Sequence, residues 1–190
     1  MVEAATRLFI RDGYVVTTVE SIAVEAGVSA KTVYDTFATK GGVLRGVWDL
    51  ALKGDLDDAP VGVRPWYLAV LAETDPDKVI ARLAKAAVAA KERIGPVLRV
   101  IRAASTVDEE SAALWALIGT DFHANQQVIV EHLAALRALA PGLTVAKATD
   151  VLWTLNHPDV WLLLHDERGW SPREFDRWLA AALNAALLGK

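Results

Sequence analysis

Apolar residues recur every three or four positions along most of this chain, which is the spacing of amphipathic helices. Apolar and polar residues nowhere alternate over a convincing run, so the pattern predicts an all-α protein. Glycine, proline and helix-capping residues separate the segments. The predicted helices cover residues 2–11, 18–26, 29–37, 39–53, 66–73, 76–91, 94–105, 109–139, 144–156, 158–168 and 171–188.

The segment GDLDDAPVGVRP, Gly54–Pro65, interrupts the helical pattern and is the best candidate for a boundary. Before it, two short helical segments meet at Gly27, a residue that tolerates a positive φ. Ala23 is small enough for the helices to cross steeply, and Val28 and Val33 are predicted to fill the inner corner. This spacing predicts a helix-turn-helix, whose second helix can enter the major groove of DNA.

The outward face of that second helix is polar. Lys31, Thr32 and Asp35 point away from the apolar face and can reach base edges or phosphates, and the Tyr34 hydroxyl can reach a phosphate. Thr18 and Lys40 place donors near helix N-termini, where anions are favoured.

The charge balance does not exclude DNA binding by this helix. The net charge is −4, but residues 1–53 hold six basic and six acidic side chains, so the negative excess lies in the rest of the chain. An acidic protein can still bind DNA if a few donors and helix ends converge on one face. The absence of cysteine fits a reducing cytoplasm. The apolar runs are shorter than the roughly 20 residues of a membrane span, and the start lacks the pattern of a signal peptide, so we expect a cytoplasmic protein without a membrane partner.

The segments AATRLFIRDGY, TTVESIAVEAGVSAKTVYDTFATK and VL resemble the N-terminal domain of TetR-family transcriptional regulators over roughly residues 4–47. The resemblance implies a helix-turn-helix DNA-binding domain at 1–47 and a helical ligand-binding and dimerisation domain at 48–190. It further implies a homodimer that binds a double-stranded DNA operator and responds to a small-molecule effector. The implied DNA-binding residues are Thr18, Ser29, Lys31, Thr32, Tyr34 and Lys40, with Asp35 and Thr36 as further candidates.

Gly41 and Gly42 depart from the family pattern, because acidic, helix-favouring residues are usual after the lysine. Glycine weakens a helix interior by about 1 kcal/mol relative to alanine, so the sequence predicts a soft join between the two domains.

The C-terminal body offers few candidates for chemistry. No nucleophile–base pair or carboxylate cluster has useful spacing, which argues against an enzyme, a cofactor or a catalytic residue. His123 and His132 lie on opposite sides of one helix, so no metal site is predicted. An apolar cavity with a few polar anchors is expected. The candidate ligand-binding residues are Trp115, His123, Asn125, Trp153 and Trp161.

From Trp178 onward the last helix is apolar almost all round, which predicts a twofold partner against it, with the helix at 144–156 contributing. The sequence therefore favours a homodimeric, ligand-responsive regulator, most simply a repressor. The alternatives are a helical ligand-binding or adaptor protein that does not bind DNA and, as the least favoured, a small-molecule enzyme.

Overall fold

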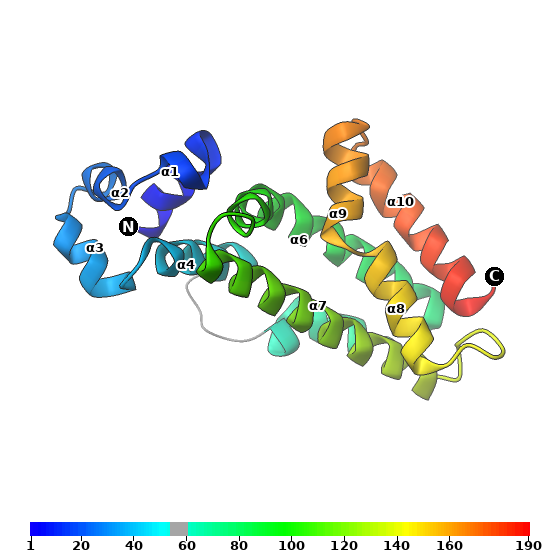
Figure 1. The fold of residues 1–190 in the computed structure, drawn as a ribbon. Helices are drawn as coiled ribbons and strands as arrows, with labels where there is room; N and C mark the ends of the chain where they lie inside the picture. The colour runs from blue at the N-terminus through cyan, green and yellow to red at the C-terminus, as the bar shows by residue number, and fades with distance from the viewer. Residues whose placement is uncertain (54–60) are drawn as a thin grey trace. The chain divides into compact units, whose positions relative to one another are not determined.

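A computed structural model describes residues 1–53 and 61–190, so most of the predicted boundary at 54–65 lies outside the described residues. The described chain is helical and contains no strand, which confirms the all-α prediction (Figure 1). Its elements are α1 (Val2–Val16), α2 (Val19–Ala26), α3 (Ala30–Phe37), α4 (Lys40–Lys53), the 3-10 helix η1 (Val61–Val63), α5 (Pro65–Leu71), α6 (Pro76–Ala104), α7 (Glu109–Ala135), α8 (Val145–Leu155), α9 (Pro158–Trp161), the π-helical turn η2 (Leu162–Glu167), α10 (Pro172–Leu183) and the π-helical turn η3 (Asn184–Leu188).

These elements form two compact units. The first unit consists of the described residues within 1–58 together with Arg93–Ile118, and the second of the described residues within 59–92 together with Gly119–Lys190. Helices α6 and α7 each contribute one part to each unit. The first unit therefore holds α1 to α4 together with the end of α6 and the start of α7. A domain boundary between residues 47 and 48 stays a prediction.

Local sequence signals set the ends of the short N-terminal helices. Thr18 caps α2, accepting a hydrogen bond from the Ser21 amide at 3.1 Å, and the Ser21 hydroxyl accepts one from the Thr18 amide at 3.1 Å. Gly27 ends α2 with φ 68 and ψ 30, a left-handed conformation that glycine adopts without steric cost. Ser29 then caps α3. In α1, the regular helix is interrupted at Gly13, with φ 82 and ψ 167.

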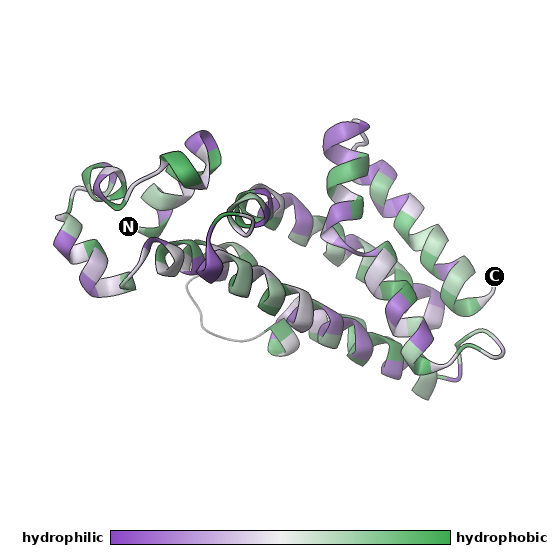
Figure 2. Cartoon of the chain, in the orientation of Figure 1, coloured by the Kyte–Doolittle hydropathy of each residue, from purple (hydrophilic) through white to green (hydrophobic). Residues whose placement is uncertain are grey.

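The core of the first unit joins the N-terminal helices to parts of α6 and α7. Phe9 of α1, Ile22 of α2 and Leu44 of α4 are fully buried, and Leu98 and Ile101 of α6 belong to the same apolar cluster. Figure 2 shows apolar positions as faces on these helices rather than over their whole surface. Burial of these faces holds together helices that are too short to be stable alone.

The inner corner of the helix-turn-helix differs in one detail from the prediction. Val33 of α3 is buried, as expected, but Val28 is exposed. The Val28 amide donates to the Ala23 carbonyl at 3.0 Å, which closes the turn after Gly27 through the backbone. The prediction that the Val28 side chain fills the corner was therefore wrong, because the turn is closed by a main-chain hydrogen bond instead.

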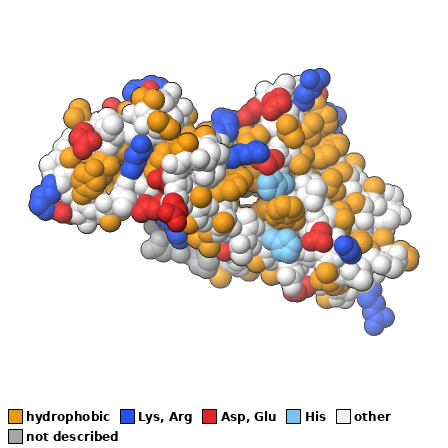
Figure 3. All heavy atoms as spheres, viewed as in Figure 1, with side chains coloured by type: hydrophobic (Ala, Val, Ile, Leu, Met, Phe, Trp, Pro, Cys, Tyr) orange, Lys and Arg blue, Asp and Glu red, His pale blue; other side chains and the backbone are white. Residues whose placement is uncertain are grey.

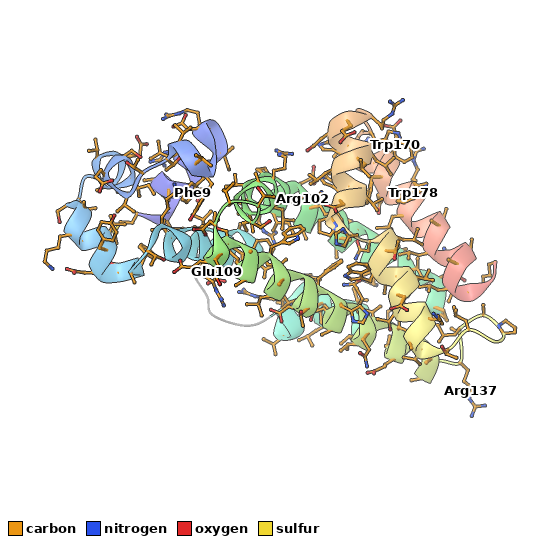
Figure 4. The ribbon with its side chains drawn as sticks, viewed as in Figure 1. Phe9, Arg102, Glu109, Arg137, Trp170 and Trp178 are labelled. Atoms are coloured by element: carbon orange, nitrogen blue, oxygen red, sulfur yellow. The ribbon has the colours of Figure 1, made fainter. Side chains whose placement is uncertain are left out.

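The second unit is built around aromatic and leucine side chains. Trp161 of α9 packs edge-on against Phe175 of α10, with ring centres 5.0 Å apart, and both are buried. Ser171 and Glu174 form the predicted capping box at the start of α10. Figure 4 shows Trp178 on α10 and Trp170 just before it, and their rings meet edge-on at 6.1 Å between centres.

Helix α6 corrects the prediction of two helices at 76–91 and 94–105. It is continuous through Gly95 and Pro96. A proline inside a helix removes one backbone hydrogen bond and destabilises it by roughly 3 kcal/mol. Ile94, Val97 and Leu98 are all buried beside it, and each buried aliphatic side chain stabilises by about 1.5–3 kcal/mol. Burial on this scale offsets the local penalty, which the sequence pattern alone does not reveal.

Gly41 and Gly42 have a steric role at the start of α4. A Cβ on Gly41 would lie 2.8 Å from the Cβ of Glu110 and would overlap its carboxylate. The Glu110 carboxylate is held there by the Thr39 hydroxyl, which donates to Oε2 at 2.5 Å. A Cβ on Gly42 would overlap the carbonyl oxygen of Phe37. The glycines thus permit close packing, whereas the sequence predicted only a soft join.

We expect Gly42→Ala to destabilise the protein by about 1–3 kcal/mol, because the new methyl group meets a backbone atom that cannot move independently. The matched control is Gly119→Ala, a helical glycine in α7 whose Cβ would meet nothing within 4 Å. That change should stabilise by up to about 1 kcal/mol through helix propensity. Urea unfolding followed by circular dichroism measures both, and equal effects of the two substitutions would contradict the steric explanation.

Candidate nucleic-acid interface

The outward face of α3 is exposed and polar. Lys31, Thr32 and Asp35 are exposed, and Tyr34 is 45% exposed despite its large ring. Ser29 also lies at the surface, where its hydroxyl accepts the Thr32 amide at 3.0 Å and lies 2.8 Å from the Thr32 hydroxyl. The predicted DNA-binding residues of this helix thus share one solvent-facing surface, while Val33 anchors the opposite face.

Two cations of the N-terminal helices are paired with carboxylates. Lys31 Nζ lies 2.6 Å from Asp35 Oδ2, one turn further along α3. Arg7 pairs with Glu25 at 3.0 Å. Figure 3 shows basic and acidic side chains interspersed over this unit. An exposed ion pair contributes only about 0–1 kcal/mol, so Lys31 can exchange its carboxylate for a DNA phosphate at little cost.

Lys40 contacts the end of α1. Its Nζ lies 4.2 Å from the centre of the Tyr14 ring and donates to the Val15 carbonyl at 3.4 Å. Burial lowers the pKa of Lys40, and Asp108 opposes that shift. Burial likewise raises the pKa of Tyr14 to about 12. Lys40 is thus positioned by the end of α1 at the N-terminus of α4.

Thr18 lies at the other helix N-terminus that the sequence singled out. It is exposed, and its hydroxyl is engaged by the Ser21 amide, as described above. The structure thus places Thr18 and Lys40 at the starts of α2 and α4, and the other candidates on or beside α3. Contact of any of these residues with DNA stays a prediction.

Comparison with known proteins agrees with this geometry. Residues 1–47 match the family model described as bacterial regulatory proteins, tetR family. The N-terminal part of this chain is therefore similar to TetR-family regulators. No protein of curated function matches the chain.

Several solved structures share the fold over nearly the whole chain. NalD of Pseudomonas aeruginosa, the secondary repressor of the MexAB-OprM multidrug efflux pump, is 24% identical with a TM-score of 0.70, covering 98% of this chain and 94% of its own. PfmR, a TetR-family transcriptional regulator of Thermus thermophilus, is 20% identical with a TM-score of 0.66, covering 97% and 94%. SmeT in complex with triclosan is 16% identical with a TM-score of 0.73, covering 98% and 89%. The chain therefore shares its fold with these solved structures.

The candidate ligand-binding residues fall into separate groups. Trp115 packs against the core of the first unit, whereas the other four lie in the second unit. His123 and Trp153 meet edge-on, with ring centres 6.3 Å apart. Trp161 is buried and stacks on His165 at 4.3 Å. The backbone carbonyl of Asn125 accepts the Tyr67 hydroxyl at 2.9 Å. Their role in ligand binding stays a prediction.

A buried polar cluster in the second unit was not singled out from the sequence. Lys91 of α6 is 4% exposed, and its Nζ donates to Asn156 Oδ1 at 2.5 Å. Asn156 Nδ2 donates to Gln126 Oε1 at 3.0 Å. Burial lowers the pKa of Lys91 from 10.5 to about 7. Lys91 sits in an ordinary amphipathic pattern, so only its packing distinguishes it from the exposed lysines of the chain.

Other classes of site find little support in the described residues. No group of three or more histidine, aspartate or glutamate side chains there is arranged to hold a metal ion. None of the described helices combines the length and hydrophobicity that crossing a lipid bilayer requires.

We expect Asp35→Asn to strengthen binding of mixed-sequence DNA, because it frees Lys31 for a phosphate. The slope of log K against log salt should steepen by about one unit if one further phosphate is neutralised. The charge-matched control is Asp49→Asn on α4, whose partner Arg45 lies 3.9 Å away. Fluorescence anisotropy over a salt series measures both, and an equal effect of the two changes would show that only net charge matters.

The lowered pKa of Lys91 predicts how the free energy of unfolding depends on pH. Its pKa is 10.5 in the unfolded chain and about 7 in the folded one, so between these values the unfolded chain holds the additional proton. The free energy of unfolding should therefore rise with pH from about 7 towards 10.5. Lys91→Met should lack this contribution. Urea unfolding at several pH values checks the difference between the two proteins, and parallel curves would refute it.

Proposed function

We propose that this protein is a transcriptional repressor that binds a palindromic operator as a homodimer and changes its DNA affinity when a small molecule binds the second unit. The observation that carries the proposal is α3, a capped helix with one buried face and one exposed polar face, within a TetR-type N-terminal domain. A helix of this kind reads base edges in the major groove, and a twofold pair of such helices requires a twofold operator.

Binding by the predicted residues divides into two roles. Tyr34 and Lys40 hold the DNA backbone, since a phenol hydroxyl and an ammonium group both donate to phosphate oxygens. Lys31 and Thr32 lie on the exposed face of α3 and contact base edges in the operator complex, whereas on mixed-sequence DNA Lys31 pairs with a phosphate instead. Thr18 and Ser29 add donors at the starts of α2 and α3, where the helix dipoles favour the anionic backbone.

Similar structures support the repressor role and the response to a ligand. NalD is a repressor of a multidrug efflux pump, and SmeT was solved as a complex with triclosan. In this chain α6 and α7 each contribute residues to both units, so a ligand that shifts either helix acts on both units. The dimer is proposed to have one state that binds DNA and one that does not. The ligand can change the affinity for DNA only as far as its own affinity differs between these two states.

The homodimer is proposed to form through α10 and α8. Phe175, Leu179 and Leu183 bury one side of α10, whereas Ala181 on another side is exposed. Small alanine side chains allow a second helix to approach closely. Sedimentation of the full chain checks the oligomeric state.

A gel-shift assay with the promoter region next to the protein's own gene tests the proposal. We expect a specific complex whose affinity falls with salt. Tyr34→Phe and Lys40→Ala should weaken binding about equally for all sequences, whereas changes at Lys31 or Thr32 should alter sequence preference. Absence of any specific complex across genomic fragments would refute regulation and favour a helical protein that does not bind DNA.

A further inference from the structure

The second unit buries a positive charge that no described carboxylate balances. Lys91 is 96% buried, and its hydrogen bond goes to a neutral amide oxygen of Asn156. Its other close partner is the ring of Phe175, whose centre lies 5.7 Å from Nζ. An ammonium group has three donors and no acceptor. Burial of an unpaired charge is strongly unfavourable, so the side chain either loses its proton or gains an anionic partner, and a bound anion would stabilise the ammonium form.

The amides around Lys91 are fixed by a chain of hydrogen bonds. Gln126 Nε2 donates to the Phe122 carbonyl at 3.3 Å, which leaves its Oε1 to accept from Asn156 Nδ2 at 3.0 Å. The Asn156 oxygen must then face Lys91. The chain draws on α6, α7 and the end of α8, and every member except Lys91 is neutral. It therefore orients the ammonium group without neutralising it.

A second group in this region also lacks an acceptor. Trp153 lies one turn before Asn156 on the same side of α8, and its indole Nε1 is buried without a hydrogen-bond partner. Its ring packs edge-on against His157, with ring centres 4.7 Å apart. Figure 3 shows histidines beside hydrophobic side chains on the visible face of this unit. An indole nitrogen can only donate, so here too the missing partner is an acceptor.

We propose that this cluster binds an organic acid, with the carboxylate of the ligand on Lys91 and an apolar body against the neighbouring aromatic rings. A carboxylate accepts charge-assisted hydrogen bonds from the ammonium and supplies the missing negative charge. A neutral ligand leaves the charge unbalanced, and a cationic one meets repulsion. The lowered pKa of Lys91 agrees with a cation that lacks its partner in the free protein. The claim that the acid is the effector rests on the proposed function. The claim that the acid binds at Lys91 does not.

The apolar body has suitable surroundings. Trp161 and Phe175 lie edge-on at 5.0 Å between ring centres, and Phe175 faces Lys91. Phe122, whose carbonyl holds Gln126, meets His157 at 6.3 Å between ring centres. Flat aromatic acids and medium-chain alkyl acids both match such walls, whereas highly polar acids such as citrate do not.

The test uses the full chain and four probes: 2-naphthoate and decanoate, with 2-naphthamide and decanamide as neutral counterparts of the same shape. Isothermal titration at pH 6.5 and tryptophan fluorescence measure binding. We expect at least one acid to bind at least tenfold more tightly than its amide. Lys91→Met should reduce the affinity for that acid to the level of the amide. The control Lys85→Met removes an exposed charge from the same helix and should change neither affinity.

Three outcomes would overturn the inference: no binding of either acid, equal binding of acid and amide, or unchanged acid binding by folded Lys91→Met. If that variant does not fold, the difference in affinity between acid and amide for the unchanged protein still tests whether the site binds a carboxylate. A gel shift run in parallel separates this inference from the proposed function. A specific DNA complex with no acid binding refutes only the acid site. Acid binding at Lys91 without effect on the DNA complex refutes only the role of the acid as effector.

Discussion

The helix-turn-helix depends on packing that its own residues cannot supply. Helices α2 and α3 have eight residues each, and isolated helices of fewer than about 12–15 residues are marginal in water. Ile22 and Val33 anchor them, but the cluster that covers these side chains extends to Leu98, Ile101 and Leu114. The first unit is completed by segments that lie far from α3 in sequence. The orientation of the exposed face of α3 is consequently set by the parts of α6 and α7 within residues 93–118 as well as by the turn.

Local signals were sufficient to predict most helix ends and the turn. Thr18, Gly27 and Ser29 have roles that depend on the backbone within a few residues, so the sequence displays them directly. The exposed face of α3 could be predicted for the same reason, because one buried residue, Val33, sets the rotation of a two-turn helix. These are the features on which the interface geometry rests.

Features that depend on distant residues could not be predicted in this way. Pro96 looked like a helix break, and only the buried side chains around it explain the continuity of α6. Gly42 looked like a flexible joint, because its contact with the Phe37 carbonyl depends on how the chain turns before α4. Lys91 gave no signal at all, since its burial is decided by partners 35 and 65 positions away in the sequence (126 − 91 and 156 − 91). The grouping of the candidate tryptophans likewise required the fold.

The contact between Gly41 and Glu110 bears on how the N-terminal segment of this protein could be combined with another body. Glu110 belongs to α7 and lies more than sixty positions beyond the segment that the family model matches. Its carboxylate nevertheless packs against Gly41 of α4 and accepts a hydrogen bond from the Thr39 hydroxyl. A hybrid protein made by joining this N-terminal segment to another body would lose that contact, and a foreign segment with a larger residue at position 41 would collide with the Glu110 side chain. The N-terminal segment is thus not an independent module here, because its transfer to another protein requires that Gly41 and Glu110 be transferred together.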